Sequence, residues 1–323
     1  MKIFLKILTV LVGLVAVTIV GGIIYINYAF PKVGIAPNLT ASNDSAFIAR
    51  GEYLVNNVTA CWDCHSENDH AKFAGKVIPG TEGKGGNVYP EQAGFPGTFY
   101  SPNLTSYHLE NWTDGEIALA ITAGVSKDGE PLFPLMPYKS YRYLANEDLK
   151  AIISYLRTIK PIKNDVARSE ASFPFSLIMR TIPAEASPME LPDRSNSVKS
   201  GEYLTHIGGC ISCHTPLDDQ NAPIAGMTLA GGQEFDLPTG GIVRSVNITP
   251  DEETGIGNWD KDAFINRFKY YENNDSIFVK KDDFNSLMPW YVYAGMNEED
   301  LGAIYDYLMV QKPVKNAIER FTP

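Results

Sequence analysis

All four cysteines of this 323-residue chain fall into one short pattern that occurs twice. Residues 61–65 read Cys-Trp-Asp-Cys-His and residues 210–214 read Cys-Ile-Ser-Cys-His, and Cys-x-x-Cys-His is the attachment pattern of a c-type haem. Thiols three positions apart face the same side of a helical turn, reach two porphyrin vinyl groups, and deliver the adjacent imidazole to the iron. The pattern predicts two covalently attached haem c groups. The residues that hold them are Cys61, Cys64 and His65 in one copy and Cys210, Cys213 and His214 in the other.

Three other uses of cysteine fit the pattern less well. A closed structural zinc site needs four ligands, usually as two spaced pairs, whereas each copy offers three ligands within five residues. A thioredoxin-like dithiol is expected in a βαβ context and does not need the following histidine. A framework of two disulfides would hardly place both cysteine pairs in the same pentapeptide. Haem attachment is therefore the preferred interpretation.

The two halves of the chain match well beyond this motif. The clearest correspondences are residues 51–54 with 201–204, 111–112 with 258–259, 135–137 with 287–289 and 160–164 with 312–316. From Met136 onward the offset is constant, since 288 − 136 and 308 − 156 both give 152. We interpret the chain as a duplicated domain and call residues 45–165 the first repeat and residues 196–323 the second repeat. Residues 166–195, rich in proline, are predicted to be a semi-rigid linker.

Each repeat is predicted to be a small, all-α domain that packs around its haem. Apolar spacing predicts a first and a last helix in each repeat, at about 45–58 and 147–159, and again at about 196–207 and 298–310. Asn146 is predicted as the N-cap of one of these helices, and Thr113-x-x-Glu116 as a capping box that begins a middle helix. The glycine-rich stretch between the haem motif and Trp112 is predicted to be loop, and no sheet is evident.

Met136 and Met288 are the predicted sixth ligands of the two irons. A haem with an open face can bind oxygen or peroxide, whereas a thioether that closes the face favours electron transfer. Both methionines stand in Leu-Met-Pro, and Pro137 and Pro289 would fix the backbone of a loop that holds sulfur toward iron. Plain apolar packing is the alternative for a single methionine, but the repetition favours ligation. The histidines without a counterpart, predicted not to be ligands, are His70, His108 and His206.

Other residues near the motif have predicted supporting roles. Trp112 and Trp259 occupy matching positions in the two repeats, and each is predicted either to pack against the edge of a haem or to belong to an ordinary apolar core. Residues 103–105 and 247–249 have the Asn-x-Thr glycosylation pattern, but their matched positions suggest a loop near the haem instead. Pro216 is a candidate for a backbone carbonyl that accepts from the imidazole N–H.

The amino terminus carries a membrane signal. Residues 7–26 contain no charge over 20 positions, close to the ~20 residues that span a bilayer as a helix. Lys2 and Lys6 precede this run and predict a cytoplasmic amino terminus. A cleaved signal peptide is the alternative, although its apolar region is typically only ~7–15 residues. We predict an anchor at residues 1–30 and a tether at 31–44, with the haem domains in the periplasm of a bacterial inner membrane crossed once.

Net charge limits the choice of partners. The chain carries a formal charge of −11, which makes binding to nucleic acid improbable. The charge is uneven, because residues 46–165 carry a net −3 and residues 196–323 a net −9. An acidic second repeat would steer toward a basic partner, although a merely solvated surface explains the charge equally well.

The motifs together resemble a known family. Paired Cys-x-x-Cys-His units followed by Leu-Met-Pro are those of class I c-type cytochromes. Residues 247–251, 254–259 and 133–138 resemble more closely the cytochrome c subunits of membrane-bound alcohol and gluconate dehydrogenases, over nearly all of the exported part. The resemblance implies tandem class I cytochrome c domains with His/Met ligation, acting as the electron outlet of a periplasmic dehydrogenase. Those subunits commonly carry three haem units, and this sequence has two.

The predicted function is that of an electron carrier and not of an enzyme. A membrane-anchored di-haem cytochrome c would pass single electrons from a periplasmic dehydrogenase or other donor to a respiratory-chain acceptor. The main alternative is a di-haem peroxidase with one open haem face, against which the matched Leu-Met-Pro loops speak. A sensor module that passes no electrons to a partner is the second alternative.

Overall fold

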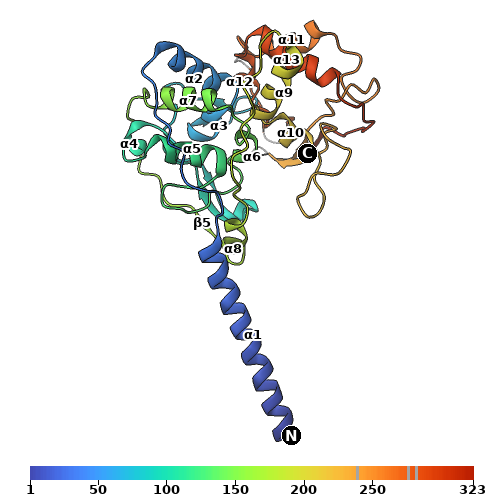
Figure 1. The fold of residues 1–323 in the computed structure, drawn as a ribbon. Coiled ribbons are helices and arrows are strands. Elements are labelled where there is room, and N and C mark those ends of the chain that lie inside the picture. Colours follow the sequence, from blue (N-terminus) through green and yellow to red (C-terminus); the bar gives the residue numbers. More distant parts are fainter. Residues whose placement is uncertain (238–239, 275–276, 281–282) are drawn as a thin grey trace.

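One long helix, α1 (Lys2–Ala29), carries a head formed by residues 31–323 (Figure 1). The structure is a computed structural model and describes residues 1–237, 240–274, 277–280 and 283–323. The 28 residues of α1 extend about 42 Å at ~1.5 Å per residue, and none of them is buried. Among the described residues, α1 alone is long and apolar enough to cross a membrane, with a mean hydropathy of 2.8, a test that a signal sequence also passes.

A crossed pair of helices forms the frame of each repeat. The pairs are α2 (Ser45–Asn57) with α7 (Asn146–Leu156), and α9 (Ser197–Ile207) with α13 (Glu298–Met309). A Cβ on Gly51 would clash with the carbonyl oxygen of Ala151, and one on Gly201 with that of Ala303. Both backbones therefore approach as closely as glycine allows, at matching points of the two repeats. The four helices lie where the sequence predicts them, to within about three residues.

Shorter helices complete the head. They are α3 (Cys61–His65), α4 (Ser106–Leu109), α5 (Asp114–Ala123), α6 (Tyr138–Tyr141), α8 (Phe175–Arg180), α10 (Cys210–His214), α11 (Lys261–Lys269), α12 (Trp290–Ala294) and the 3₁₀ turn Glu91–Ala93. Thr113 and Glu116 form the predicted capping box, with both of its hydrogen bonds, at the start of α5. The prediction for Asn146 is wrong, because α7 begins at that residue and buried Ala145 is its N-cap.

The all-α prediction holds only in part, because three small antiparallel sheets accompany the helices. Their strands are β1 (Asn68–Asp69) with β2 (Lys76–Val77); β3 (Val88–Tyr89), β4 (Gly97–Tyr100) and β5 (Glu170–Ala171); and β6 (Glu234–Asp236), β7 (Ile242–Arg244) and β8 (Phe321–Thr322). Each strand has only two to four residues, too few to show an alternating pattern. Two of the sheets recruit a strand from far along the chain, β5 and β8, which local sequence does not reveal.

The two repeats meet through reciprocal hydrogen bonds. Tyr53 in the first repeat donates to the Asp300 carboxylate of the second at 2.6 Å. Tyr203 in the second donates to the Asp148 carboxylate of the first at 2.8 Å. Tyr53 corresponds to Tyr203 and Asp148 to Asp300, so the same contact is made in both directions. Burial, followed by the neighbouring carboxylate, raises the pKa of each tyrosine, which keeps both hydroxyls protonated and able to donate.

Further pairs extend this near-twofold relation. The backbone N–H of Asn297 donates to the Tyr53 hydroxyl and that of Ala145 to the Tyr203 hydroxyl, each at 3.2 Å. Each aspartate is also ion-paired, Asp148 with Arg50 and Asp300 with Arg194, at 2.8 Å in both cases. One cluster of buried apolar side chains runs through both repeats. The repeats therefore hold a defined relative position.

The linker segment packs on the first repeat. The ring of Phe175 meets that of Phe133 edge-on, with centroids 5.9 Å apart, and Arg180 is ion-paired with Glu130 at 2.8 Å. Farther along, the backbone N–H of Ser187 donates to the carbonyl of Arg142. These contacts explain how a proline-rich segment without a long helix can still be held in place.

Candidate haem sites

His65 and His214 are presented by two helices of the same length and geometry. Each helix has five residues and follows a residue with left-handed backbone, Ala60 (φ 49°) before α3 and Gly209 (φ 73°) before α10. The histidine ends its helix and is 5% exposed in the first repeat and 7% in the second. The sharp turn before each helix lets five residues present two thiols and an imidazole together.

A backbone carbonyl holds each imidazole in the same way. Nδ1 of His65 lies 2.8 Å from the carbonyl oxygen of Pro102, and Nδ1 of His214 lies 2.7 Å from that of Val246. A carbonyl only accepts, so Nδ1 carries the proton and Nε2 keeps its lone pair. Desolvation lowers the pKa of His65 to about 4 and also lowers that of His214. Both rings are thus in the neutral form that can ligate a metal through Nε2.

The prediction that Pro216 supplies a carbonyl to His214 is wrong. The Pro216 carbonyl accepts instead from the backbone N–H of Ile224, 3.0 Å away, in a local turn. The partner is Val246, which immediately precedes the Asn-x-Thr segment 247–249, as Pro102 precedes 103–105 in the first repeat. The expectation that these two segments lie near the haem motif is confirmed.

The Asn-x-Thr segments are buried turns that fix the position of the accepting carbonyls. Asn103 is 1% exposed, accepts from the N–H of Thr105 at 2.8 Å and donates to the carbonyl of Ile162 at 2.8 Å. Asn247 is 3% exposed and makes the matching bonds to Thr249 and to Val314, at 2.9 and 2.7 Å. Side chains this buried and bonded are structural, and they are not glycan acceptors in the folded chain.

Two asparagines that sequence reasoning did not single out complete this support. Asn164 donates to the carbonyl of Lys84 at 3.1 Å, and Asn316 donates to the carbonyl of Ala230 at 3.0 Å. The following glycines, Gly85 and Gly231, donate to the carbonyls of the two candidate ligands, His65 and His214. The repeated Lys-Pro-x-Lys-Asn segment was the signal that could have identified these asparagines.

The four cysteines are free thiols beside these histidines. Cys61, Cys64 and Cys210 are partly buried and Cys213 is exposed. Desolvation raises the pKa of Cys61 and Cys64 to about 11 and that of Cys210 to about 12, so these thiols stay protonated at neutral pH. A thioether to haem forms when S–H adds across a vinyl C=C bond, which needs two unpaired thiols next to an imidazole. Each five-residue helix supplies that set, so the residues present fit haem c.

Met136 and Met288 occupy matching turns. The N–H of Tyr138 donates to the carbonyl of Met136 at 2.8 Å, and the N–H of Trp290 donates to that of Met288 at 2.7 Å. The intervening proline is the N-cap of the next helix, α6 or α12. Both methionines are partly buried and pack against the core cluster. The shared turn gives the two thioethers the same backbone support.

A tyrosine ties each methionine turn to the helix that carries the histidine. Tyr141 on α6 donates to the carbonyl of Thr59, and Tyr293 on α12 donates to that of Gly208 at 2.6 Å. Thr59 and Gly208 both lie two residues before a cysteine helix. The two sides of each candidate site are therefore mechanically coupled within a repeat.

The two candidate sites also touch across the interface of the repeats. Ser140 on α6 lies against Ser212 on α10, with hydroxyl oxygens 2.8 Å apart. The helix that follows Met136 in the first repeat thus contacts the cysteine helix of the second. The residue that corresponds to Ser212 is Asp63, and desolvation raises the pKa of its carboxyl to about 7.

The histidines without a counterpart lie outside this arrangement. The ring of His206 packs against Tyr143, with centroids 4.8 Å apart, and that of His108 against Trp112 at 5.9 Å. His70 is exposed and lies next to Gly75. Each of the three has the local surroundings expected of a surface or packing residue.

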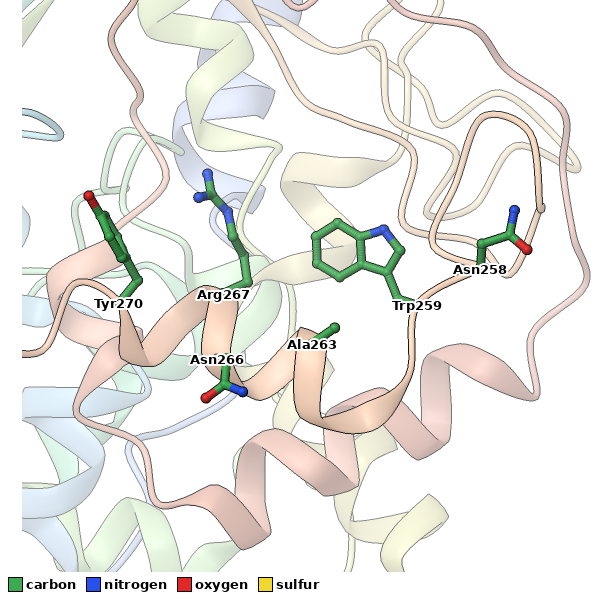
Figure 2. Close-up of a pocket in the computed structure, with 6 residues that line it drawn as sticks. All are labelled: Asn258, Trp259, Ala263, Asn266, Arg267 and Tyr270. Carbon is green, nitrogen blue, oxygen red and sulfur yellow. The ribbon is translucent and has the colours of Figure 1, made fainter.

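The corresponding tryptophans have different surroundings. Trp112 packs against the core cluster, and its indole N–H is buried without a hydrogen-bond partner in the described part of the chain. Trp259 is 38% exposed and lines an open groove of about 410 Å³ along α11. Figure 2 shows the other residues that line this groove, Asn258, Ala263, Asn266, Arg267 and Tyr270. Arg267 lies 4.8 Å over the ring of Trp290, so the groove adjoins the Met288 turn.

The arrangement is the one expected of a c-type haem site, and known proteins of similar sequence are cytochromes. The chain is 28% identical over 306 residues to the cytochrome c subunit of alcohol dehydrogenase (quinone) from Gluconacetobacter polyoxogenes, covering 90% of this chain and 61% of that protein. It is 31% identical over 239 residues to the fructose dehydrogenase cytochrome subunit of Gluconobacter japonicus, covering 69% and 45%. A diheme cytochrome c-type protein of Cereibacter sphaeroides is 26% identical over 199 residues, covering 59% and 63%.

The predicted resemblance is confirmed: homologues of this chain are cytochrome c subunits of alcohol, fructose and gluconate dehydrogenases. Such relatives support haem c as the cofactor of this chain. No family model matches the chain. The chain spans between 45 and 61% of the length of these dehydrogenase subunits.

Proposed function

We propose that the chain is a membrane-anchored di-haem cytochrome c that carries single electrons from a periplasmic dehydrogenase to a respiratory-chain acceptor. One observation carries the proposal. In both repeats a neutral histidine is held through Nδ1 by a carbonyl, next to two free thiols on the same short helix. The presence of two such helices, α3 and α10, supports two haems.

In each repeat, the five-residue cysteine helix and the methionine turn would together hold one haem. Cys61 and Cys64 would form its thioethers in the first repeat, and His65 and Met136 would ligate the iron. Cys210, Cys213, His214 and Met288 have the same roles in the second repeat. When bound, haem supplies the one-electron chemistry, and methionine ligation favours a comparatively high reduction potential.

The chain's own residues would limit structural change during electron transfer. The carbonyls of Pro102 and Val246 keep each imidazole in one tautomer and one orientation. Tyr141 and Tyr293 keep each methionine turn at a constant distance from the cysteine helix. The hydrogen bond between Ser140 and Ser212 helps to fix the position of one site relative to the other across the interface. A rigid pair of sites suits electron transfer between them.

The anchor and the partners rest on α1 and on the relatives. The apolar length of α1 supports a single span that keeps the head at the membrane. The relatives are named as subunits of dehydrogenases, which supports a dehydrogenase as the donor and a role in electron transfer for this chain. An inner-membrane location with a periplasmic head follows from covalent haem attachment outside the cytoplasm.

Spectroscopy and redox titration of the full chain test the proposal. We expect two covalently bound haems per chain, both low-spin when oxidised, that titrate as one-electron couples. Cys61→Ala/Cys64→Ala and Cys210→Ala/Cys213→Ala are matched variants, each expected to retain one haem, as intact mass would show. A purified membrane dehydrogenase of the alcohol-oxidising type should reduce both haems of the parent protein.

The same spectra distinguish the proposed electron carrier from a di-haem peroxidase. A peroxidase would show a high-spin haem in the resting oxidised protein, because one iron face must be open. The matched turns at Met136 and Met288 speak against an open face, and the relatives named above are cytochromes. A high-spin signal from either haem would contradict the His/Met assignment for that site.

A further inference from the structure

The junction between α1 and the head carries apolar side chains that no described part of the chain covers. On α8 and just before it, Phe173 is 75% exposed and Ile178 is 53% exposed. On the other side of the junction, Tyr28 is 94% exposed and Ile35 is 93% exposed. We call these four residues the junction patch. Residues 26–31, 33–43 and 171–179 carry no charge, so each of the four patch residues lies in an uncharged stretch of chain.

The patch is held rigidly against the end of α1. Helix α8 packs against α1, and Arg180 at its end donates to the carbonyl of Phe30 at 3.3 Å. The tether runs beside the linker through a parallel bridge between Lys32 and Ala184. Figure 1 shows α8 at the point where α1 enters the head. The junction patch is therefore continuous with the apolar surface of α1.

Helix α8 packs one face on the protein, and its other face is exposed in the part of the chain that the structure describes. Its inner face is fixed by Phe175 on Phe133 and by the ion pair of Arg180 with Glu130. Its preceding strand, β5, pairs with β4 of the first repeat. Phe173 and Ile178 have no role in these contacts. Folding of the head alone does not explain two large, exposed apolar side chains at this place.

The length of α1 places this patch at the depth of the membrane interface. The uncharged run, residues 7–26, accounts for about 30 Å at ~1.5 Å per residue, which is the thickness of the hydrocarbon core. Tyr25 and Tyr28 then lie at headgroup level, where aromatic side chains are enriched. Because α8 packs on this same end of α1, it lies at the same level. The charge of −11 argues against attraction to anionic lipid, so the contact is apolar.

We propose that the junction patch inserts into the interfacial layer of the lipid bilayer, so that α8 is a second, shallow membrane contact beside α1. The inference rests on the proposed anchoring by α1. Two contacts restrict rotation of the whole chain about the axis of α1, which a single span leaves free. The side of the head that carries α8 would then face the membrane, and α2 and α13 would lie on the side away from it (Figure 1).

Photo-crosslinking of the full, haem-loaded chain in phosphatidylcholine vesicles tests the proposal. p-Benzoylphenylalanine replaces one residue at a time: Phe173 or Ile178 in the patch, Leu14 in α1, or Val310 after α13. Leu14 and Val310 are 60% and 62% exposed, similar to Ile178, so differences in adduct yield report surroundings and not exposure. Mass spectrometry of the intact chain measures lipid adducts after illumination.

We expect adducts at positions 173 and 178 within about threefold of the yield at position 14, and at least about tenfold above that at position 310. Adducts at 14 but only background at 173 and 178 would overturn the second contact and leave the anchor intact. Protein–protein adducts at 173 in place of lipid adducts would overturn it too, and would identify the patch as a protein interface. A yield of lipid adducts no higher than background at position 14 would refute anchoring by α1, and with it the proposed second contact.

Discussion

Between its two cysteines the first repeat carries Asp63, and the second carries Ser212 at the same place. After the methionine turn, the first repeat has Tyr138, which is 2% exposed, and the second has Trp290, which Arg267 covers. The imidazole–carbonyl bonds differ by only 0.1 Å, at 2.8 and 2.7 Å. The atoms that would hold a haem are thus the same in both repeats, while the residues around them differ. Such differences are the means by which two equally ligated haems acquire different potentials and partners.

The largest expected effect concerns the close helix crossing that both repeats share. Gly51→Ala and Gly201→Ala should each lower the free energy of unfolding by about 3 kcal/mol or more, because the new Cβ meets a backbone carbonyl that cannot move alone. Urea unfolding of the haem-loaded chain measures this. Gly302→Ala is the matched control, since its Cβ would lie 3.4 Å from the Lys261 side chain and 3.7 Å from that of Ile265, and we expect it to be neutral or stabilising. If only one of the two substitutions left the stability unchanged, the helix crossings of the two repeats would not be packed alike.

Replacing each methionine tests whether the two sites are ligated alike. Met136→Ala and Met288→Ala should each lower the potential of one haem by about 0.1 V or more, within the ~0.8 V range that axial ligands control. Met227→Ala, a half-buried methionine outside the repeated turn, should leave both potentials unchanged. Redox titration followed optically separates the two couples. A variant that shifts neither potential would remove that methionine from the ligand set.

The hydroxyl groups of the two reciprocal tyrosines should contribute unequally to the free energy of unfolding. Tyr203 is 2% exposed and accepts from the N–H of fully buried Ala145, whereas Tyr53 is only partly buried and accepts from that of exposed Asn297. Tyr203→Phe should therefore cost about 2–3 kcal/mol and Tyr53→Phe about 1 kcal/mol, since a polar group left unpaired is more costly inside the protein. Equilibrium unfolding of the two variants compares them. Equal losses would mean that burial does not distinguish the two contacts.

The smallest expected effect is a pH dependence found in one haem only. Desolvation raises the pKa of Asp63 to about 7, so its carboxyl is neutral below that pH and negative above it. The negative charge stabilises the ferric state, so the potential of the first haem should fall as pH rises from about 6 to 8, by less than ~59 mV per pH unit. The second haem, beside Ser212, serves as the internal control. Asp63→Asn should abolish the slope, and a slope that survives this change would have another origin.

Sequence patterns predict well the features that depend on residue type and local spacing. The four frame helices and the capping box at Thr113 belong to this group, while the haem-attachment residues remain a prediction. The carbonyls of Pro102 and Val246 do not, because a backbone carbonyl has no sequence signature and these lie 37 and 32 positions from their histidines. The strands were missed since two to four residues carry no period. Pairs such as Tyr53 with Asp300 need knowledge of how the repeats pack.

The repeated Asn-x-Thr segments show how a pattern can be noticed before its role is understood. Their matched positions correctly placed them near the haem motif. Their physical task, however, is to form a buried turn that aims the carbonyl of the preceding residue at an imidazole. That task appears only when hydrogen bonds to Ile162 and Val314, from the far end of each repeat, are known.

The crossed tyrosine–aspartate contacts have a consequence for how this chain arose. An interface in which residue i meets residue j, and j meets i, is isologous, as between the subunits of a symmetric homodimer. A single ancestral unit with one such tyrosine and one such aspartate could have paired with its own copy. Joining the copies through residues 166–195 replaces a bimolecular association by an intramolecular one, at an effective concentration of about millimolar. Pairing then no longer depends on expression level, and the two halves become free to diverge.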